Sequence, residues 1–279
     1  MRHNEQMSSC SRLRYLEANP RTSAGWPADR PLAGTLVLLH AFPLGARMWE
    51  PQQALAASGW HVVMPQFRGF DCATPDGLDA QSLDDYAADV ADLMQTLSVS
   101  RAVIGGLSMG GYVALALYRR APELFAGLIL ADTRAEADSK EARVNRTRLI
   151  ALAGTAGVSG VADDMLPTLL GATTQSTQPA VEGRVRALIA ANQVGAVQAA
   201  LRGMMTRDDS TELLPSIAVP TLVVVGDEDT LTPPAASEAM ASALPSATLV
   251  VIPQAGHLSN LEQPQAFNAA VLSFLERCQ

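Results

Sequence analysis

Stretches that are apolar throughout alternate along the chain with stretches that are apolar on one side only. Residues 35–40 (TLVLLH) and 125–131 (FAGLILA) contain almost no polar position, which is typical of strands covered on both faces of a parallel sheet. Residues 82–97 instead place apolar side chains at helical spacing behind a serine and two aspartates, as in a capped amphipathic helix. This alternation predicts an α/β fold with a mostly parallel, doubly wound sheet.

The other predicted elements continue the same alternation on both sides of these segments. Further strands are expected at residues 12–18, as an edge strand, and at 61–65, 102–105, 221–225 and 248–252. Further helices are expected at residues 48–58, 109–120, 235–244 and 264–276.

Residues 134–214 interrupt the alternation, because they contain no strand pattern. Four helical segments are expected there, at residues 136–153, 158–170, 179–191 and 194–206. A long helical insertion between two strands is either a functional lid or decoration on one sheet edge. We favour a helical cap over residues 134–214, a core formed by 11–133 and 215–279, and a disordered leader at 1–10.

Composition narrows the class of protein. The chain has 279 residues, of which 48% are hydrophobic and 17% charged, so it can bury a large core. A net charge of −8 without a basic stripe argues against nucleic acid as a partner. No secretory signal and no apolar run of about 18–20 residues is visible, so we expect no membrane span and a cytoplasmic location. Cys10, Cys72 and Cys278 are odd in number and scattered, which predicts neither a disulfide framework nor a zinc site.

Ser108 is the candidate nucleophile. It stands between Gly106 and Gly110 in GLSMG, after an apolar strand-like run and before a helix-like one. In that context the G-x-S-x-G pattern predicts a sharp strand-to-helix turn that exposes the serine hydroxyl. Side chains two residues away on either side would clash in such a turn, which explains the glycines.

A serine hydroxyl needs a base within hydrogen-bonding reach. The chain has four histidines, of which His3 lies in the expected leader and His61 opens a strand, where a structural role is more common. His257 lies in a loop after the last strand and before the last helix. It follows the serine in the chain, as the base does in sheets of this kind, so we predict that His257 is the base.

The acid that orients the histidine has more than one candidate. Asp227, Glu228 and Asp229 follow a predicted strand in VVVGDEDTLTPP, at the edge where α/β active sites form. We favour Asp229, and expect Asp227 to bond backbone N–H groups of the turn. Asp132 also follows a strand, and is either a rival acid or a cap for the first helix of the insertion.

The oxyanion of the tetrahedral intermediate needs donors already aimed at it. The backbone N–H of Met109 follows the nucleophile, and that of Phe42 lies in the loop after TLVLLH. We predict that these two groups form the oxyanion hole and that His40 braces the loop, the alternative being an ordinary strand-to-helix connection. GGLSMGG lacks the spacing of dinucleotide and phosphate loops, and no cluster of side chains has metal-ligand spacing, so no cofactor or metal is expected.

HAFPLG, GLSMGG, GDEDTLTPP and AGHLSNLEQP, in this order, resemble the α/β-hydrolase superfamily. They are most similar to its small bacterial carboxylesterases, enol-lactonases and cofactor-free perhydrolases. The resemblance implies the α/β-hydrolase fold with Ser108, Asp229 and His257 as a triad, and excludes relatives that use an aspartate nucleophile. Ala41 stands at a position where the family often has glycine. Pro43, directly after the predicted oxyanion residue Phe42, is a feature shared with members that have some perhydrolysis activity.

Together these features predict a serine esterase that forms a covalent acyl-serine intermediate. The expected substrate is a small to medium, largely apolar carboxylic ester, with Met204 and Met205 of the cap as candidate pocket residues. A lactonase with the same triad is the alternative, and a non-catalytic ligand sensor on the same scaffold is the remote one. The sequence leaves the natural substrate and the oligomeric state open.

Overall fold

The computed structural model describes residues 13–22, 26–27, 29–70 and 82–278. These residues form one seven-stranded sheet in the order β1-β3-β2-β4-β5-β6-β7. Every neighbouring pair is parallel except β1 and β3, which pair antiparallel at one edge. The predicted sheet is therefore confirmed. Its strands are β1 (Arg14–Ala18), β2 (Gly34–Leu39), β3 (Trp60–Gln66), β4 (Ala102–Leu107), β5 (Phe125–Ala131), β6 (Thr221–Gly226) and β7 (Ala247–Ile252).

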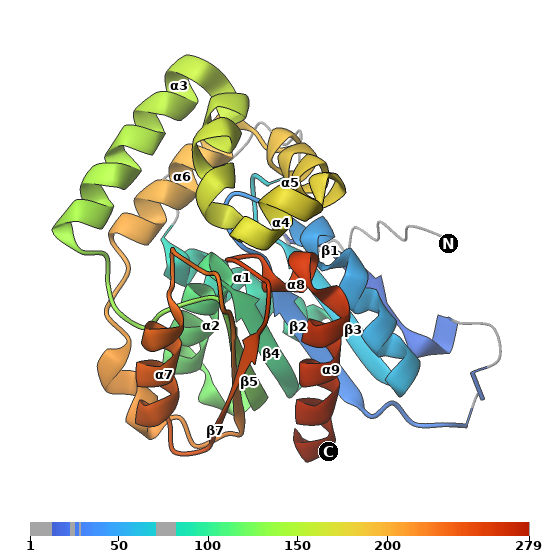
Figure 1. Ribbon diagram of the computed structural model, residues 1–279. Helices are drawn as coiled ribbons and strands as arrows, with labels where there is room; N and C mark the ends of the chain where they lie inside the picture. Colours follow the sequence, from blue (N-terminus) through green and yellow to red (C-terminus); the bar gives the residue numbers. More distant parts are fainter. Residues whose placement is uncertain (1–12, 23–25, 28, 71–81, 279) are drawn as a thin grey trace.

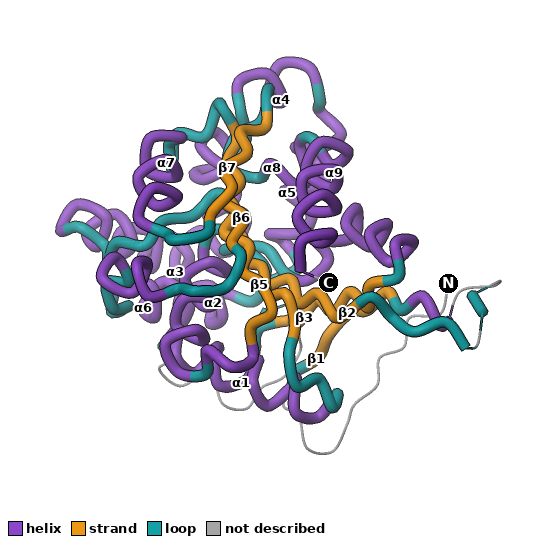
Figure 2. Tube along the Cα trace, turned by 90° about the horizontal axis from the view of Figure 1, so that it is seen from below, coloured by secondary structure: helices purple, strands orange, loops and turns teal. Residues whose placement is uncertain are grey.

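Helices cover both faces of the sheet, as Figures 1 and 2 show. One face carries α1 (Leu83–Thr96), α2 (Met109–Arg120) and α7 (Pro234–Ala243), and the other carries η2 (Ala46–Ser58) and α9 (Pro264–Leu275). The shorter elements are η1 (Pro20–Thr22), η3 (Pro122–Leu124), η4 (Thr211–Ser216), α8 (Ser259–Glu262) and η5 (Glu276–Cys278).

Strand β2 shows why its sequence is apolar throughout. Side chains alternate between the two faces of a strand. Leu36 and Leu38 accordingly join the apolar cluster beneath η2 and α9, whereas Val37 and Leu39 join the cluster beneath α1 and α2. The strand thus contributes to two cores, as the sequence pattern predicts.

Four helices lie between β5 and β6 and form the helical insertion, residues 134–214. They sit together over one end of the sheet (Figure 1). Residues 134–214 contain no strand, as predicted. The loops that follow the strands lie at this end of the sheet. One contact that indicates this is the hydrogen bond from Asn192 of the insertion to the carbonyl of Pro43, in the loop after β2. The helices are α3 (Lys140–Leu169), α4 (Ala172–Thr177), α5 (Pro179–Ala190) and α6 (Val194–Met205).

Helix α3 is the one helix among the described residues that is long and apolar enough to cross a membrane by length and composition. It is broken at Gly157, whose φ of 68° and ψ of −171° are not helical. Only glycine adopts such a conformation readily. The break lies where the sequence predicts a gap between two helices, so α3 consists of two helical segments joined at a bend.

Two elements differ from expectation. Residues 48–58 were predicted as an ordinary helix but belong to the 3₁₀ helix η2, which contains Pro51; proline cannot donate the backbone hydrogen bond of an α-helix interior. Helix α4 was not predicted, because ATTQST lacks apolar spacing.

The start of α1 is as predicted, with Asp85 N–H donating to Ser82 Oγ at 3.2 Å. The expected leader, Cys10 and Cys72 lie outside the described residues, and Cys278 is a free, partly buried thiol.

Candidate active site

Ser108 lies in a sharp turn between β4 and α2. Its φ of 53° and ψ of −114° are strained for a residue with a side chain. A Cβ on Gly106 would come within 2.1 Å of the backbone of Gly110, and a Cβ on Gly110 within 2.1 Å of the Leu39 carbonyl oxygen. Both positions therefore require glycine. The Ser108 N–H donates to the Ala131 carbonyl at 2.9 Å, which ties the turn to β5.

His257 and Asp229 meet in the loops that follow β7 and β6. The imidazole Nδ1 lies 2.8 Å from Oδ2 of Asp229, and both side chains are buried. The Thr232 hydroxyl donates to the same carboxylate oxygen at 2.5 Å and lies 3.2 Å from Nδ1. The structure thus pairs the predicted base with the favoured acid, and adds Thr232, which sequence reasoning missed.

The Asp229 carboxylate is surrounded by donors. Its Oδ1 accepts the N–H groups of Leu231 at 2.8 Å and Thr232 at 2.9 Å. Burial by itself raises the pKa of Asp229, but the charge of His257 and the hydrogen bonds from His257 and Thr232 outweigh it, so the pKa is lowered. This environment favours the ionised carboxylate beside the imidazole.

Asp132 lies at the same end of the sheet but contacts other groups. Its Oδ1 accepts the Gly226 N–H at 2.9 Å, and the Ser259 hydroxyl donates to its Oδ2. Burial, and then the charge of Asp229, raise the pKa of Asp132 well above its usual value. The expectation that Asp132 caps the first insertion helix is wrong, because Ser139 caps α3 by accepting the Ala142 N–H at 3.2 Å.

The turn after β6 also differs from expectation. Asp227 was expected to bond the turn's own backbone, but Asp229 accepts those N–H groups itself. Asp227 Oδ1 instead faces the Ala255 N–H across the neighbouring loop, at 3.4 Å. The acid loop and the histidine loop are therefore joined by contacts that local sequence does not indicate.

His40 occupies the loop after β2 as predicted. Its Nδ1 lies 3.0 Å from the Ala41 carbonyl, and its Nε2 lies 3.1 Å from the Phe67 N–H. These partners fit a neutral ring with its proton on Nδ1. Burial lowers the pKa of His40 to about 4, although the Ala41 bond opposes the shift. The ring also packs against Phe67 and Phe70, with centroids 4.4 and 5.0 Å away.

Phe42 and Met109, the predicted oxyanion donors, lie in the loop after β2 and at the start of α2. Phe42 directly follows the residues that His40 braces, and the loop is held further by the Ala41 N–H, 3.1 Å from the Met48 sulfur. Met109 is the first residue of α2. Among the hydrogen bonds of the described residues, neither the Phe42 nor the Met109 N–H has an acceptor within the protein, so both are free for a ligand oxygen.

The helical insertion contacts the loops that carry Phe42, Asp229 and His257. Asn192 donates from Nδ2 to the Pro43 carbonyl at 2.6 Å, beside Phe42. Glu228, next to Asp229, accepts the Thr173 N–H at 2.8 Å. Glu262, five residues after His257, accepts the Gly171 N–H at 2.8 Å. Sequence reasoning considered Glu228 only as one of three candidate acids after β6 and missed Glu262, for which the only signal is a carboxylate close to a predicted catalytic residue.

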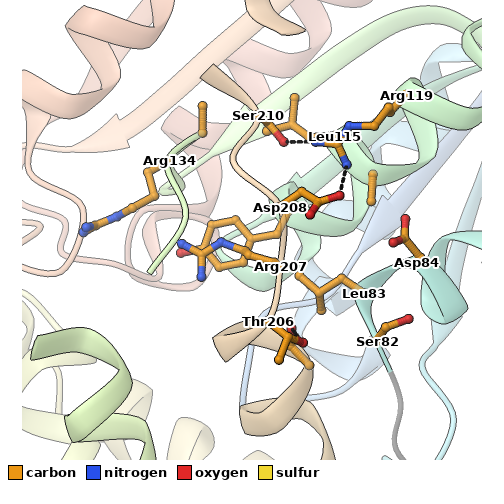
Figure 3. Close-up of a pocket in the computed structure, with 14 residues that line it drawn as sticks. Ser82, Leu83, Asp84, Leu115, Arg119, Arg134, Thr206, Arg207, Asp208 and Ser210 are labelled. Atoms are coloured by element: carbon orange, nitrogen blue, oxygen red, sulfur yellow. Dashed lines mark hydrogen bonds and ion pairs between the residues drawn. The ribbon is translucent and has the colours of Figure 1, made fainter. Parts of the chain in front are cut away.

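A small pocket of about 40 Å³ lies between α1, α2 and the end of α6 (Figure 3). Arg119 is one of its lining residues; it donates to Ser210 Oγ at 2.8 Å and lies 3.7 Å from Asp208 Oδ2. None of the predicted catalytic residues lines it. Because drug-sized ligands occupy clefts of about 300–1,000 Å³, this pocket has room for water but not for an ester.

Met204 and Met205 lie at the end of α6. Met204 is buried in the apolar cluster that includes Leu201 of the same helix and Leu149 of α3, whereas Met205 is partly exposed. Neither lines the small pocket.

Among the residues that the structure describes, no group of three or more His, Cys, Asp or Glu side chains is placed to hold a metal ion.

Comparisons with known proteins bear on the family and on the fold. The family model described as the alpha/beta hydrolase fold matches residues 34–264. The 3-oxoadipate enol-lactonase 2 of Acinetobacter baylyi is 29% identical over 253 residues, which cover 90% of each chain. An esterase structure from Thermogutta terrifontis has a TM-score of 0.86 at 36% identity, covering 95% of this chain and 94% of its own. An enol-lactonase structure from Burkholderia xenovorans has a TM-score of 0.82 at 28% identity, covering 95% and 96%.

Proposed function

The chain belongs to the alpha/beta hydrolase family, and on this basis we propose that it hydrolyses carboxylic esters through a covalent ester on Ser108. The observation that carries the proposal is the 2.8 Å contact between His257 Nδ1 and Asp229 Oδ2. A buried carboxylate on Nδ1 leaves Nε2 as the basic nitrogen, which is the arrangement that a serine nucleophile needs.

In the first half of the reaction, the Ser108 hydroxyl oxygen attacks the ester carbonyl carbon while His257 Nε2 takes the hydroxyl proton. The carbonyl oxygen becomes negative and accepts hydrogen bonds from the N–H groups of Phe42 and Met109. The bond to the alcohol oxygen then breaks, and His257 returns its proton to the leaving alkoxide. Asp229 stabilises the imidazolium that exists between these two proton transfers.

In the second half, water attacks the acyl-serine carbonyl carbon and gives a proton to His257. The same two N–H groups bind the second oxyanion. When the bond between Ser108 Oγ and the acyl carbon breaks, His257 protonates the serine, and a carboxylic acid leaves. The cycle consumes one water and requires no cofactor.

The helical insertion serves in this proposal as the cap over the site, with residues 11–133 and 215–279 as the hydrolase core. Its contacts with the loops of Phe42, Asp229 and His257 support that role. Its interior is apolar, with Leu149, Val161 and Val197 fully or almost fully buried. A cap surface of the same apolar character facing Ser108 would favour substrates with a substantially apolar body.

A lactonase is the second candidate, because two of the similar proteins are described as enol-lactonases. Opening a lactone requires the same nucleophile, base and oxyanion donors, and differs only in that the leaving alcohol remains attached to the acyl group. The shape of the pocket then decides which substrate reaches Ser108.

One experiment tests the activity and separates these candidates. The purified protein is assayed with p-nitrophenyl esters of increasing acyl length and with enol-lactones and acyl-lactones, beside Ser108→Ala. We expect turnover by the wild type alone, and the higher kcat/KM identifies an esterase or a lactonase. Stoichiometric binding of these compounds without any turnover would instead indicate a ligand sensor.

A further inference from the structure

Glu262 is a buried carboxylate that none of the catalytic steps uses. It ends α8, is 1% exposed, and its two oxygens point to different parts of the fold. Oε1 accepts the N–H groups of Gly256 at 3.0 Å and Leu258 at 3.1 Å, the two neighbours of His257. Oε2 accepts the N–H of Gly171 at 2.8 Å, at the start of α4 in the insertion.

The backbones joined by Glu262 are also in direct contact with each other. A Cβ on Gly256 would come within 2.2 Å of the Gly171 nitrogen, and a Cβ on Gly171 within 2.7 Å of the Gly256 nitrogen. Gly226, which precedes the acid loop, packs equally closely, since its Cβ would lie 2.2 Å from the Ala255 carbonyl oxygen. No side chain separates the insertion from the histidine loop at this junction.

We propose that Glu262 is a positioning residue that couples the placement of the insertion to the placement of His257. The proposal rests on the proposed function, in which His257 is the base. A single planar carboxylate holds both amides that flank His257 and one amide of the insertion, so displacement of α4 changes the bonds that fix the His257 backbone. Buried N–H groups that lose their acceptor are costly, so the two segments keep their places together.

Glu228 provides a matched comparison, because it holds the insertion without holding the His257 neighbours. Its Oε2 accepts the Thr173 N–H at 2.8 Å, and its Oε1 accepts the Thr173 hydroxyl. Glu228 and Glu262 therefore bind the same short helix, and only Glu262 also binds Gly256 and Leu258. A difference between their variants isolates the coupling to His257.

The test compares Glu262→Gln with Glu228→Gln in the full chain. Steady-state rates are divided by the fraction of Ser108 that a fluorophosphonate titrates. We expect Glu262→Gln to lower kcat about 10–100-fold, the scale of a catalytic group displaced by about 1 Å, and Glu228→Gln to act mainly on KM. An unchanged kcat in Glu262→Gln, or equal kcat losses in both variants, would overturn the proposal.

Hydrogen exchange followed by mass spectrometry gives a second measurement that does not depend on activity. In Glu262→Gln the peptides covering residues 171–173 and 255–258 should both exchange faster, whereas in Glu228→Gln only the first should. Faster exchange confined to residues 171–173 in Glu262→Gln would contradict the coupling. Absence of turnover in the wild type would refute the proposed function but leave this measurement decisive.

Gly171→Ala tests the same coupling if Glu262→Gln fails to fold. The added Cβ would meet Glu228 Oε2 at 2.4 Å and the Gly256 nitrogen at 2.7 Å, which pushes the insertion away from the histidine loop while the Glu262 side chain is kept. We expect kcat to fall and residues 255–258 to exchange faster. Wild-type kcat and exchange in this variant would count against the coupling.

Discussion

Asp229 Oδ2 lies 2.8 Å from His257 Nδ1, and the Thr232 hydroxyl approaches both groups. Replacing Asp229 by asparagine keeps the shape but removes the charge that stabilises the imidazolium, and it presents an amide that can favour the wrong tautomer. We expect Asp229→Asn to lower kcat roughly 10⁴-fold, as the equivalent change does in other triads. Steady-state kinetics on a p-nitrophenyl ester measure this directly.

Asp132→Asn is the matched control for that substitution. Asp132 bonds Gly226 and Ser259 rather than His257, and its raised pKa makes a neutral side chain less disruptive there than at Asp229. We expect kcat to fall less than about 10-fold, equivalent to roughly 1.4 kcal/mol. Equal losses in the two variants would show that Asp229 is not the acid.

Ser108→Ala should abolish turnover and leave the fold intact. The substitution removes the nucleophile but not the backbone bond from Ser108 to Ala131 that anchors the turn. We expect kcat to fall by about 10⁶-fold, which leaves only the roughly 10³–10⁴-fold advantage over water that oxyanion donors and binding supply, and a melting temperature close to that of the wild type. A fluorophosphonate should label Ser108 of the wild type only, and mass spectrometry of the digested protein locates the label.

His40 should make the fold less stable in acid. Its folded-state pKa is about 4, against an ordinary value of 6.5, so the unfolded chain binds the proton first as the pH falls. The stabilising contribution of the neutral ring is thus present above pH 6.5 and is lost progressively down to about pH 4. The loss amounts to about 3 kcal/mol at most. Urea unfolding at several pH values between these limits measures it.

His40→Gln provides the reference for that measurement. Glutamine does not titrate, and it can donate toward Ala41 and accept from Phe67, as the neutral imidazole does. Carboxylates elsewhere contribute equally to both proteins, so the difference between the two pH slopes belongs to His40. If wild type and variant lose stability in parallel, His40 is not the source.

Leucine at Met204 or Met205 tests whether these residues face the substrate. Exchange of methionine for leucine conserves volume and usually costs less than about 1.5 kcal/mol. Leucine is branched where methionine is linear, so it changes the shape of any pocket wall that it forms, and we expect the ratio of kcat/KM for long and short esters to shift. An equal effect on every ester, together with a lower melting temperature, would identify the methionines as core residues. Thermal unfolding and the ester series supply both measurements.

The sheet and the nucleophile turn could be predicted because their determinants are local. Alternating burial makes β2 apolar throughout, and the close approach of Gly110 to Leu39 requires glycine in the sequence itself. Helix α4 could not be predicted, since its amides are held by Glu228 and Glu262 from distant loops. The 3₁₀ geometry of η2 was missed although Pro51 was visible in the sequence.

The candidate site likewise contains residues that the sequence indicates and residues that it does not. Chain order and loop position indicate Ser108 and His257, but they do not distinguish Asp229 from Asp132, because both follow strands that end at the same edge. Only the folded arrangement, in which Asp132 accepts from Gly226 and Ser259, separates their environments. The partners of Glu262 lie on two separate loops, so no pattern in the sequence brings them together.

The insertion begins and ends at neighbouring points, because the Ser210 N–H donates to the Ala135 carbonyl at 2.9 Å and the Ala137 N–H donates to Asp209 Oδ2 at 2.9 Å. These bonds hold its two ends together, and the entropic cost of closing a replacement segment grows only slowly with its length. The core can in principle accept a transplanted cap from a relative of different specificity. A successful graft has to supply the equivalents of Gly171, Thr173 and Asn192, because those residues bond the loops that carry His257, Asp229 and Phe42.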